Sequence, residues 1–405
     1  MSKILVVIVD YIEANDFMNP SHHGFRTKHS TTTGLIQMYD SWIEAVESGQ
    51  LSVACFLDLS AAFDVVDHPL LLDKLRLYGF SGCALEWISS YLSGRSQAVY
   101  IDGFMSAALP LSSGVPQGSI LGPLLYVVYT NELPEIIHDH EVENGSIFST
   151  DCKHCGTVCC YADDSTVSLF GQDTQELTRA LSEKYEVISD FMASNKLKLN
   201  SEKTHLMLFS SDRVWRAALD DSVQLDTGSE IIKVEKSEKI LGGVVHRNLK
   251  WTEHLLHGQD AVIKNLSKRL SAIKMVCSIA DFKTRKMLTN GLFMSKLAYL
   301  MPLWGGCQKF AINTLQVMQN KAARYVTRAN IYTATESLLS QCGWLSVYQM
   351  IFFHTVVLFY KTRQSKVPSV LFNMASSDYA YSTRERSKGN YKVLSKVRIP
   401  SALAG

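Results

Sequence analysis

The sequence predicts an α+β fold in which strands and helices alternate up to about residue 246 and only helices follow. The apolar run from Val53 to Leu57 has the length and composition of a buried central strand. Two β-rich segments that meet at Asp163 and Asp164 indicate a hairpin. Residues 255–360 repeat apolar side chains at the spacing of amphipathic helices.

Two adjacent carboxylates, Asp163 and Asp164, lie at the tip of the expected hairpin. Neighbouring carboxylates that are partly buried repel each other, so one becomes protonated unless a cation neutralises the pair. Magnesium prefers such hard oxygen ligands. An Asp-rich solvent turn is the alternative interpretation, because Asp tolerates turn geometry.

A third acid, Asp58, favours the metal site. It directly follows the apolar strand, so it would lie beside the hairpin pair if the two strands were neighbours in one sheet. Asp58, Asp163 and Asp164 could then hold two ions roughly 3.5–4 Å apart, the arrangement of two-metal phosphoryl transfer. A helix cap or turn acid is the alternative for Asp58.

Helical spacing after the hairpin predicts a helix over residues 173–192, with a start that resembles a capping box at Asp173. Residues 196–200 alternate like a strand and lead to Lys203. In the later helical region two apolar stripes are expected, made by Leu266, Leu270, Ile273 and Val276 and by Leu315, Met318 and Ala322.

Several blocks of this chain resemble the reverse transcriptases of non-LTR retrotransposons. Residues 58–64 (Asp-Leu-Ser-Ala-Ala-Phe-Asp) and 161–164 (Tyr-Ala-Asp-Asp) match two palm blocks of that family almost letter for letter, and residues 114–119 (Gly-Val-Pro-Gln-Gly-Ser) match a third. Four further blocks follow in the family's order: 23–31, 199–204, 240–244 and 249–254. So many blocks in one order are a specific signal.

The resemblance implies a right-hand polymerase fold, with a small antiparallel palm sheet backed by helices. We expect partial fingers at residues 1–50, the palm at 51–246, a helical thumb at 247–365 and a basic C-terminal segment at 366–405. It further implies a two-magnesium RNA-directed DNA polymerase, with manganese as the alternative ion. The expected partners are an RNA template, a DNA primer and deoxynucleoside triphosphates.

The same resemblance assigns roles to individual residues. The metal ligands are Asp58, Asp163 and Asp164, and Lys203 assists the departing pyrophosphate. Phe63 lies beneath the incoming sugar and excludes a ribose 2′-hydroxyl, although plain core packing is its alternative. The other expected contacts are to substrate, from Gln117, Gly118 and Arg26, and to the primer end, from Leu241, Gly242 and Gly243. A surface lysine and an ordinary loop-to-helix transition are the alternatives for Lys203 and for the Gln117 loop.

The chain departs from the family pattern at its start and before the hairpin. It opens inside the fingers, so we expect the upstream fingers hairpin to be missing and the copy to be truncated. A catalytically impaired remnant that only binds nucleic acid is therefore the main alternative, and a metal-dependent nuclease or phosphatase is a second one. The insert before the hairpin carries Cys152, Cys155 and Cys159, for which a small zinc site and reduced thiols both stay open.

The overall composition indicates an ordinary globular protein. Its formal net charge of +1 does not mark a nucleic-acid binder, but basic side chains cluster between Lys264 and Lys286 and could contact phosphates or form a solvated helix face. We see neither a secretory signal nor an apolar run of the ~20 residues that a membrane span needs. The expectation is a soluble intracellular protein of the nucleus or cytoplasm.

Overall fold

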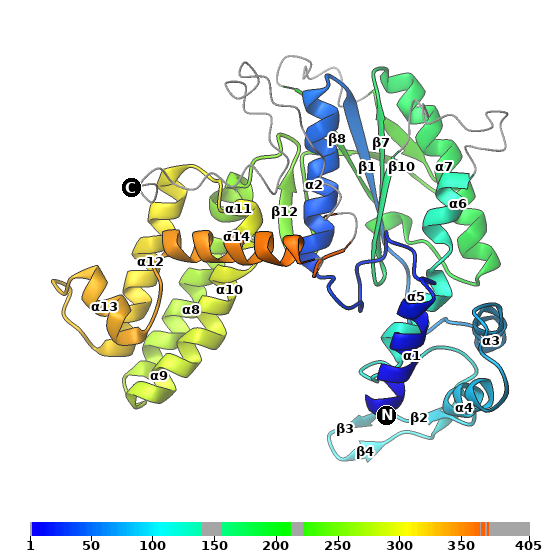
Figure 1. Ribbon diagram of the computed structural model, residues 1–405, viewed down its shortest axis with the longest axis horizontal. Helices are drawn as coiled ribbons and strands as arrows, with labels where there is room; N and C mark the ends of the chain where they lie inside the picture. Colours follow the sequence, from blue (N-terminus) through cyan, green and yellow to red (C-terminus); the bar gives the residue numbers. More distant parts are fainter. Residues whose placement is uncertain (1, 140–155, 212–221, 365, 369–370, 372–405) are drawn as a thin grey trace. The chain divides into compact units, whose positions relative to one another are not determined.

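A computed structural model describes residues 2–139, 156–211, 222–364, 366–368 and 371 (Figure 1). The chain divides into two compact units. The first comprises residues 1–34, 49–208 and 213–234, and the second comprises residues 35–48, 209–212 and 235–405. The limits expected for fingers, palm and thumb stay predictions.

The central sheet of the first unit has the strand order β6-β7-β1-β8-β10-β9 in the described part of the chain. Strand β1 pairs antiparallel with β7, which also pairs antiparallel with β6. Every residue of β1 is buried, which explains why its sequence is apolar without alternation. The α+β prediction and the central strand are confirmed. The strands are β1 (Leu51–Leu57), β6 (Thr157–Tyr161), β7 (Asp164–Gly171), β8 (His205–Phe209), β9 (Gln224–Asp226) and β10 (Ile231–Glu235).

Helices of the first unit build a core on this sheet. Helix α5 is almost wholly buried, and α7 packs against β7, β9 and α6. Helix α3 packs against α4 and α5, and the short strand β2 follows α4 in the chain (Figure 1). The helices are α1 (Ser2–Ala14), α3 (His68–Leu77), α4 (Gly82–Leu92), α5 (Gly122–Thr130), α6 (Leu133–Asp139), α7 (Thr174–Ser194) and the short η1 (Ser201–Lys203). The short strands are β2 (Ser96–Gln97), β3 (Tyr100–Ile101), β4 (Phe104–Met105) and β5 (Leu109–Pro110).

In its described part, the second unit is mainly helical, with one hairpin. Helix α2 (Thr31–Glu47) starts in the first unit, and most of its residues belong to the second. There the Trp42 ring stacks on Phe209 and the Tyr39 ring on Trp251. The remaining elements are β11 (Ser237–Ile240), β12 (Gly243–His246), η3 (Glu253–His257), α8 (Val262–Cys277), α9 (Phe282–Thr289), η4 (Asn290–Met294), α10 (Ser295–Ala298), α11 (Met301–Trp304), α12 (Lys309–Thr327), α13 (Thr335–Cys342) and α14 (Val347–Arg363).

The helix predicted over residues 173–192 is confirmed as α7. Its first turn is capped by Asp173, whose carboxylate accepts hydrogen bonds from the backbone N–H groups of Gln175 and Glu176. The strand predicted over residues 196–200 is wrong. That segment turns through Lys196, which has a positive φ of 53°, and contributes only an isolated bridge between Leu199 and Leu59.

The two stripes in the helical region differ in outcome. All residues of the second stripe are buried in α12, as predicted. In the first stripe Val276 is 39% exposed, and Cys277 takes the buried position four residues after Ile273.

In the basic cluster, Arg285 is a buried side chain that donates from Nε to the Val326 carbonyl oxygen at 2.7 Å. Most of the expected basic segment, residues 372–405 among it, lies outside the described residues.

No one helix in the described part of the chain combines the length and apolar composition needed to cross a bilayer. Helices α13 and α14 reach that composition only when taken together, across a bend of 50°.

Candidate active site

The predicted hairpin is present, and strand pairing brings its carboxylates beside Asp58. Tyr161 pairs with Asp164 across β6 and β7, so Ala162 and Asp163 form the turn. Leu57 pairs with Ser165 across β1 and β7. In an antiparallel pair the next residues along are neighbours, so Asp58 follows β1 beside Asp164 at the start of β7. Acids about a hundred residues apart therefore share one end of the sheet.

The hairpin turn is supported by the segment before α2. Cys160 donates its backbone N–H to the Ser21 carbonyl at 2.8 Å, and its own carbonyl accepts from the His23 backbone N–H at 2.7 Å. Gly24 then lies against the turn itself, because a Cβ built on it would stand 2.5 Å from the Ala162 nitrogen. Gly24 had no predicted role, and its place in the 23–31 block was the signal that pointed to it.

Mutual repulsion among the acids is visible in their electrostatics. Desolvation, then the charge of Asp163 and then that of Asp58 raise the pKa of Asp164 to about 6. One oxygen of Asp58, Oδ2, is buried without a hydrogen-bond partner. The Lys203 Nζ lies 3.3 Å from this oxygen, so the two form an ion pair without hydrogen-bond geometry. The carboxylates are therefore incompletely neutralised by the protein.

The acidic side chains do not form a preorganised metal site. Among the residues that the structure describes, no group of three or more His, Cys, Asp or Glu side chains could hold one ion. The donor chemistry nevertheless fits magnesium, since the acids offer hard oxygens and Asp58 Oδ2 is left without a hydrogen bond. The backbone thus brings the acids together, while their side chains would have to turn toward a shared ion.

Lys203 lies near Asp58 because backbone hydrogen bonds join the segment before Lys203 to the end of β1. The Asn200 backbone N–H donates to the Asp58 carbonyl at 3.0 Å, and the Ser60 N–H donates to the Lys198 carbonyl at 3.0 Å. Lys203 ends η1, and its side chain is 65% exposed. Its ammonium can therefore approach both Asp58 and a ligand from solvent.

The aromatic ring of Phe63 is packed rather than free. Its centroid lies 4.5 Å from that of the buried Tyr126, on α5, and 6.4 Å from that of Phe25. The backbone carbonyl of Phe63 accepts from the Val115 N–H at 2.8 Å, which joins the 58–64 block to the 114–119 block. The two alternatives for Phe63, core packing and contact with a sugar, are both compatible with this half-buried position.

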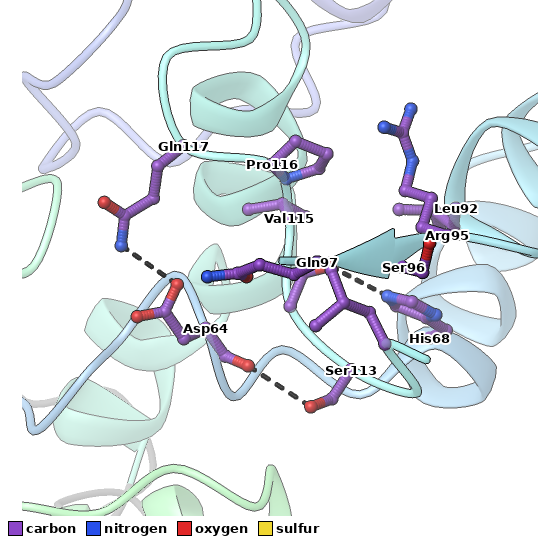
Figure 2. Close-up of a pocket in the computed structure, with 12 residues that line it drawn as sticks. Asp64, His68, Leu92, Arg95, Ser96, Gln97, Ser113, Val115, Pro116 and Gln117 are labelled. Carbon is purple, nitrogen blue, oxygen red and sulfur yellow. Dashed lines mark hydrogen bonds between the residues drawn. The ribbon is translucent and has the colours of Figure 1, made fainter. Parts of the chain in front are cut away.

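A cavity of about 690 Å³ opens next to this junction (Figure 2). Gln117 and Asp64 both line it, and the Gln117 Nε2 donates to Asp64 Oδ1 at 2.9 Å. Gly118 follows with a φ of +74°, a conformation that glycine adopts without strain. Gln117 is exposed and accessible to a ligand.

Arg26 lies in a different environment from the one expected. Its Nη1 donates to the carbonyl oxygens of Asn19 and His22 at 2.7 and 3.3 Å, and its Nε lies 3.6 Å from Glu13 Oε1. The side chain is only 9% exposed. These contacts are all structural, so a substrate contact from Arg26 stays a prediction.

The expected primer-binding residues form the tip of the β11–β12 hairpin in the second unit. Leu241 and Gly242 make the turn, with positive φ values of 46° and 76°, and Gly243 starts β12. Tyr299 supports this turn from below: its hydroxyl donates to the Leu241 carbonyl at 2.6 Å. A Cβ at Gly242 would lie 3.1 Å from Cε1 of the Tyr299 ring, so the ring would have to shift by a few tenths of an ångström to admit a side chain. Tyr299 carries no motif and was not predicted from the sequence.

Of the three cysteines considered for a zinc site, the described part of the chain includes Cys159. Cys152 and Cys155 lie outside the described residues. Cys159 is buried in β6, where burial raises the pKa of its thiol. Burial therefore opposes the thiolate form that zinc requires at this position.

Comparison with known proteins agrees with the sequence motifs. The sequence profile of the family described as reverse transcriptase (RNA-dependent DNA polymerase) matches residues 1–251. The RNA-directed DNA polymerase from the mobile element jockey of Drosophila melanogaster is 26% identical over 78% of this chain and 32% of its own length. The probable RNA-directed DNA polymerase from transposon BS of the same species is 26% identical over 84% of this chain and 37% of its own length.

The chain thus spans about a third of the length of these curated relatives. Among solved structures, a telomerase from Candida tropicalis in complex with a fragment of telomeric RNA is similar, with a TM-score of 0.42 and 11% identity over 91% of this chain and 56% of that chain.

Proposed function

This chain belongs to the reverse transcriptase (RNA-dependent DNA polymerase) family, and on that basis we propose that it is the polymerase part of a non-LTR retrotransposon. In the proposed reaction, the 3′-hydroxyl of a DNA primer attacks the α-phosphate of a deoxynucleoside triphosphate that is paired with an RNA template. Pyrophosphate leaves. The related polymerases of mobile elements support the substrate class.

The observation that carries this proposal is the register that makes Asp58 and Asp164 neighbours, with Asp163 in the adjoining turn. Desolvation, and then the charges of Asp163 and Asp58, raise the pKa of Asp164, and both effects favour a bound cation at this end of the sheet. Asp58, Asp163 and Asp164 would hold magnesium. When bound, the divalent ions would supply charge stabilisation to the attacking and leaving oxygens.

Other residues of the chain take roles that need no metal. Lys203, paired with Asp58 and exposed to solvent, would stabilise the negative charge of the departing pyrophosphate. Phe63 would restrict the space beneath the sugar, and the Gln117 amide with the Gly118 backbone would contact the nucleotide. In the second unit, the turn at Leu241, Gly242 and Gly243 would contact the primer end.

Extension of a DNA primer on an RNA template by the purified chain, with magnesium and the four deoxynucleotides, tests this function. We expect incorporation by the parent and a loss of at least about a hundredfold in Asp163→Asn, which removes one ligand charge. Asp102→Asn is the matched control, because it removes the same charge at an exposed hairpin tip of the same unit.

Three outcomes are informative. Incorporation that Asp163→Asn abolishes and Asp102→Asn preserves supports the polymerase. Template binding without incorporation by the parent would overturn it in favour of a remnant that only binds nucleic acid. Degradation of the duplex without added nucleotides would indicate a nuclease instead.

A further inference from the structure

A set of hydrogen bonds joins the loop before α5 to the segment after β1. Gly114 donates its N–H to the Val66 carbonyl at 2.7 Å, and the Ser113 hydroxyl donates to the Asp64 carbonyl at 3.2 Å. The His68 imidazole bonds the Gly114 carbonyl at 2.7 Å. The loop therefore has a fixed backbone position beneath Gln117.

A fixed backbone does not fix the direction of the Gln117 amide. A carboxamide has a donor and an acceptor of almost the same size, so a half-turn exchanges them. The exchange is blocked where the neighbouring group can only accept, as an ionised carboxylate does. The Asp64 carboxylate is the neighbouring group here, and its Oδ1 accepts from Gln117 Nε2 at 2.9 Å. Figure 2 shows the Gln117 amide nitrogen turned toward Asp64 and its oxygen turned away.

The Asp64 carboxylate and the Asp64 backbone serve different partners. The backbone carbonyl accepts from Ser113, and it lies so close to Gly114 that a Cβ there would stand 2.7 Å from it. The carboxylate is exposed at the cavity wall and points at the side chain of Gln117. Removing the carboxylate would thus leave the loop attached and release only the amide.

We propose that Asp64 is a positioning residue that holds the Gln117 amide with its oxygen directed at the incoming nucleotide. The amide then presents an acceptor, and selects a donor group on the sugar or base. This inference rests on the proposed function, because it takes a nucleotide as the ligand of Gln117. In this proposal Asp64 acts through Gln117, without a contact of its own to substrate or metal.

Steady-state incorporation of single deoxynucleotides tests the role in binding. We expect Asp64→Ala to raise the nucleotide KM about tenfold, the value of one charge-assisted hydrogen bond, while kcat changes less than about threefold. Asp64→Asn should restore only part of the loss, because its side-chain amide can accept the same hydrogen bond but can also donate, and therefore permits both orientations of the Gln117 amide. Asp64→Ala combined with Gln117→Ala should be no worse than Gln117→Ala alone. Asp102→Asn is the charge control.

A second measurement does not need polymerisation. In protein labelled with 15N-glutamine, the Gln117 side-chain amide signals are identified by their loss in Gln117→Ala. We expect these signals to shift in Asp64→Ala and to stay in place in Asp102→Asn. Unchanged Gln117 signals, or fully additive KM effects in the double variant, would overturn the positioning role. A parent chain without any incorporation would instead overturn the proposed function, while the amide signals still report on the Asp64 contact.

Discussion

Gly24 lies directly against the backbone of Ala162, in the turn that carries Asp163. A Cβ built on Gly24 would stand 2.5 Å from the Ala162 nitrogen and 3.2 Å from the Tyr161 carbonyl carbon. Both are backbone atoms of a paired hairpin, so they cannot move aside as a flexible side chain could. The segment before α2 therefore determines where the turn lies, and with it the position of one candidate metal ligand.

Replacing Gly24 with alanine should displace the turn that carries Asp163. We expect Gly24→Ala to reduce primer extension at least about tenfold and to lower the free energy of unfolding by about 1–3 kcal/mol, as overpacking does. Gly291→Ala is the matched control, because a Cβ at Gly291 meets nothing within 4 Å. Extension assays and urea denaturation of both variants test this. Parent-like activity and stability in Gly24→Ala would show that the contact is unimportant.

The sequence predicted those parts of the fold that local patterns specify. The buried strand before Asp58, the hairpin at Asp163 and α7 each carry a periodic or turn signal within a few residues, and all are present. Asp58 and Asp164 were predicted to lie close together on the expectation that the two strands next to them are neighbours in one sheet. The strand expected over residues 196–200 was wrong because alternation there reflects one bridge and a surface turn.

Features that join distant residues through one contact had no such signal. Gly24 against Ala162, Asp64 against Gln117 and Tyr299 beneath the 241–243 turn depend on where three-dimensional packing places single side chains. Arg26 lies in a matching motif, yet an ion pair with Glu13 and a hydrogen bond to the Asn19 carbonyl hold it in a structural role. A sequence motif specifies which residue type is present, whereas the groups that this residue contacts depend on how the chain folds.

Lys203 and a metal ion should compete for Asp58, since the ammonium lies 3.3 Å from Asp58 Oδ2. We expect Lys203→Met to lower the maximal extension rate by about 10- to 100-fold, through loss of charge stabilisation of the leaving group. The magnesium concentration that gives half of that rate should stay equal or fall, because the competing cation is gone. Magnesium titrations of Lys203→Met and of Lys198→Met, an exposed control in the same segment, measure both quantities. A several-fold rise in the magnesium requirement would contradict this.

Phe63 should control the choice between deoxynucleotides and ribonucleotides if it lies beneath the sugar. We expect Phe63→Val to reduce discrimination against ribonucleotides by about 10- to 100-fold, the range that one steric contact provides. It should also cost about 1–3 kcal/mol of stability, because the ring packs 4.5 Å from that of buried Tyr126. Competing incorporation of matched ribo- and deoxynucleotides measures discrimination. Phe104→Val, which removes an exposed ring, is the control. A stability loss without a change in discrimination would assign Phe63 to the core alone.

His22 in the first unit and His254 in the second are buried histidines whose charging is opposed by the fold. Burial lowers the pKa of His22 and of His254 from 6.5 to about 4, and both side chains are 1% exposed. The His254 Nδ1 accepts from the Val244 backbone N–H at 3.2 Å, which requires this nitrogen to be unprotonated. Between pH 6.5 and pH 4 the unfolded chain therefore binds more protons than the folded one.

Stability should consequently fall as the solution is acidified through this window, by up to about 3 kcal/mol for each histidine, and should be fully present above pH 6.5. Asp164 acts in the opposite direction between pH 3.8 and pH 6, since its folded pKa is raised, but its exposed position weakens the effect. Urea denaturation from pH 4.5 to pH 7.5 measures the slope. His254→Gln keeps an acceptor for Val244 without a titrating ring, so the slope in this variant should be smaller than in the parent. A parent chain with equal stability at pH 5 and pH 7 would show that neither histidine is held neutral by the fold.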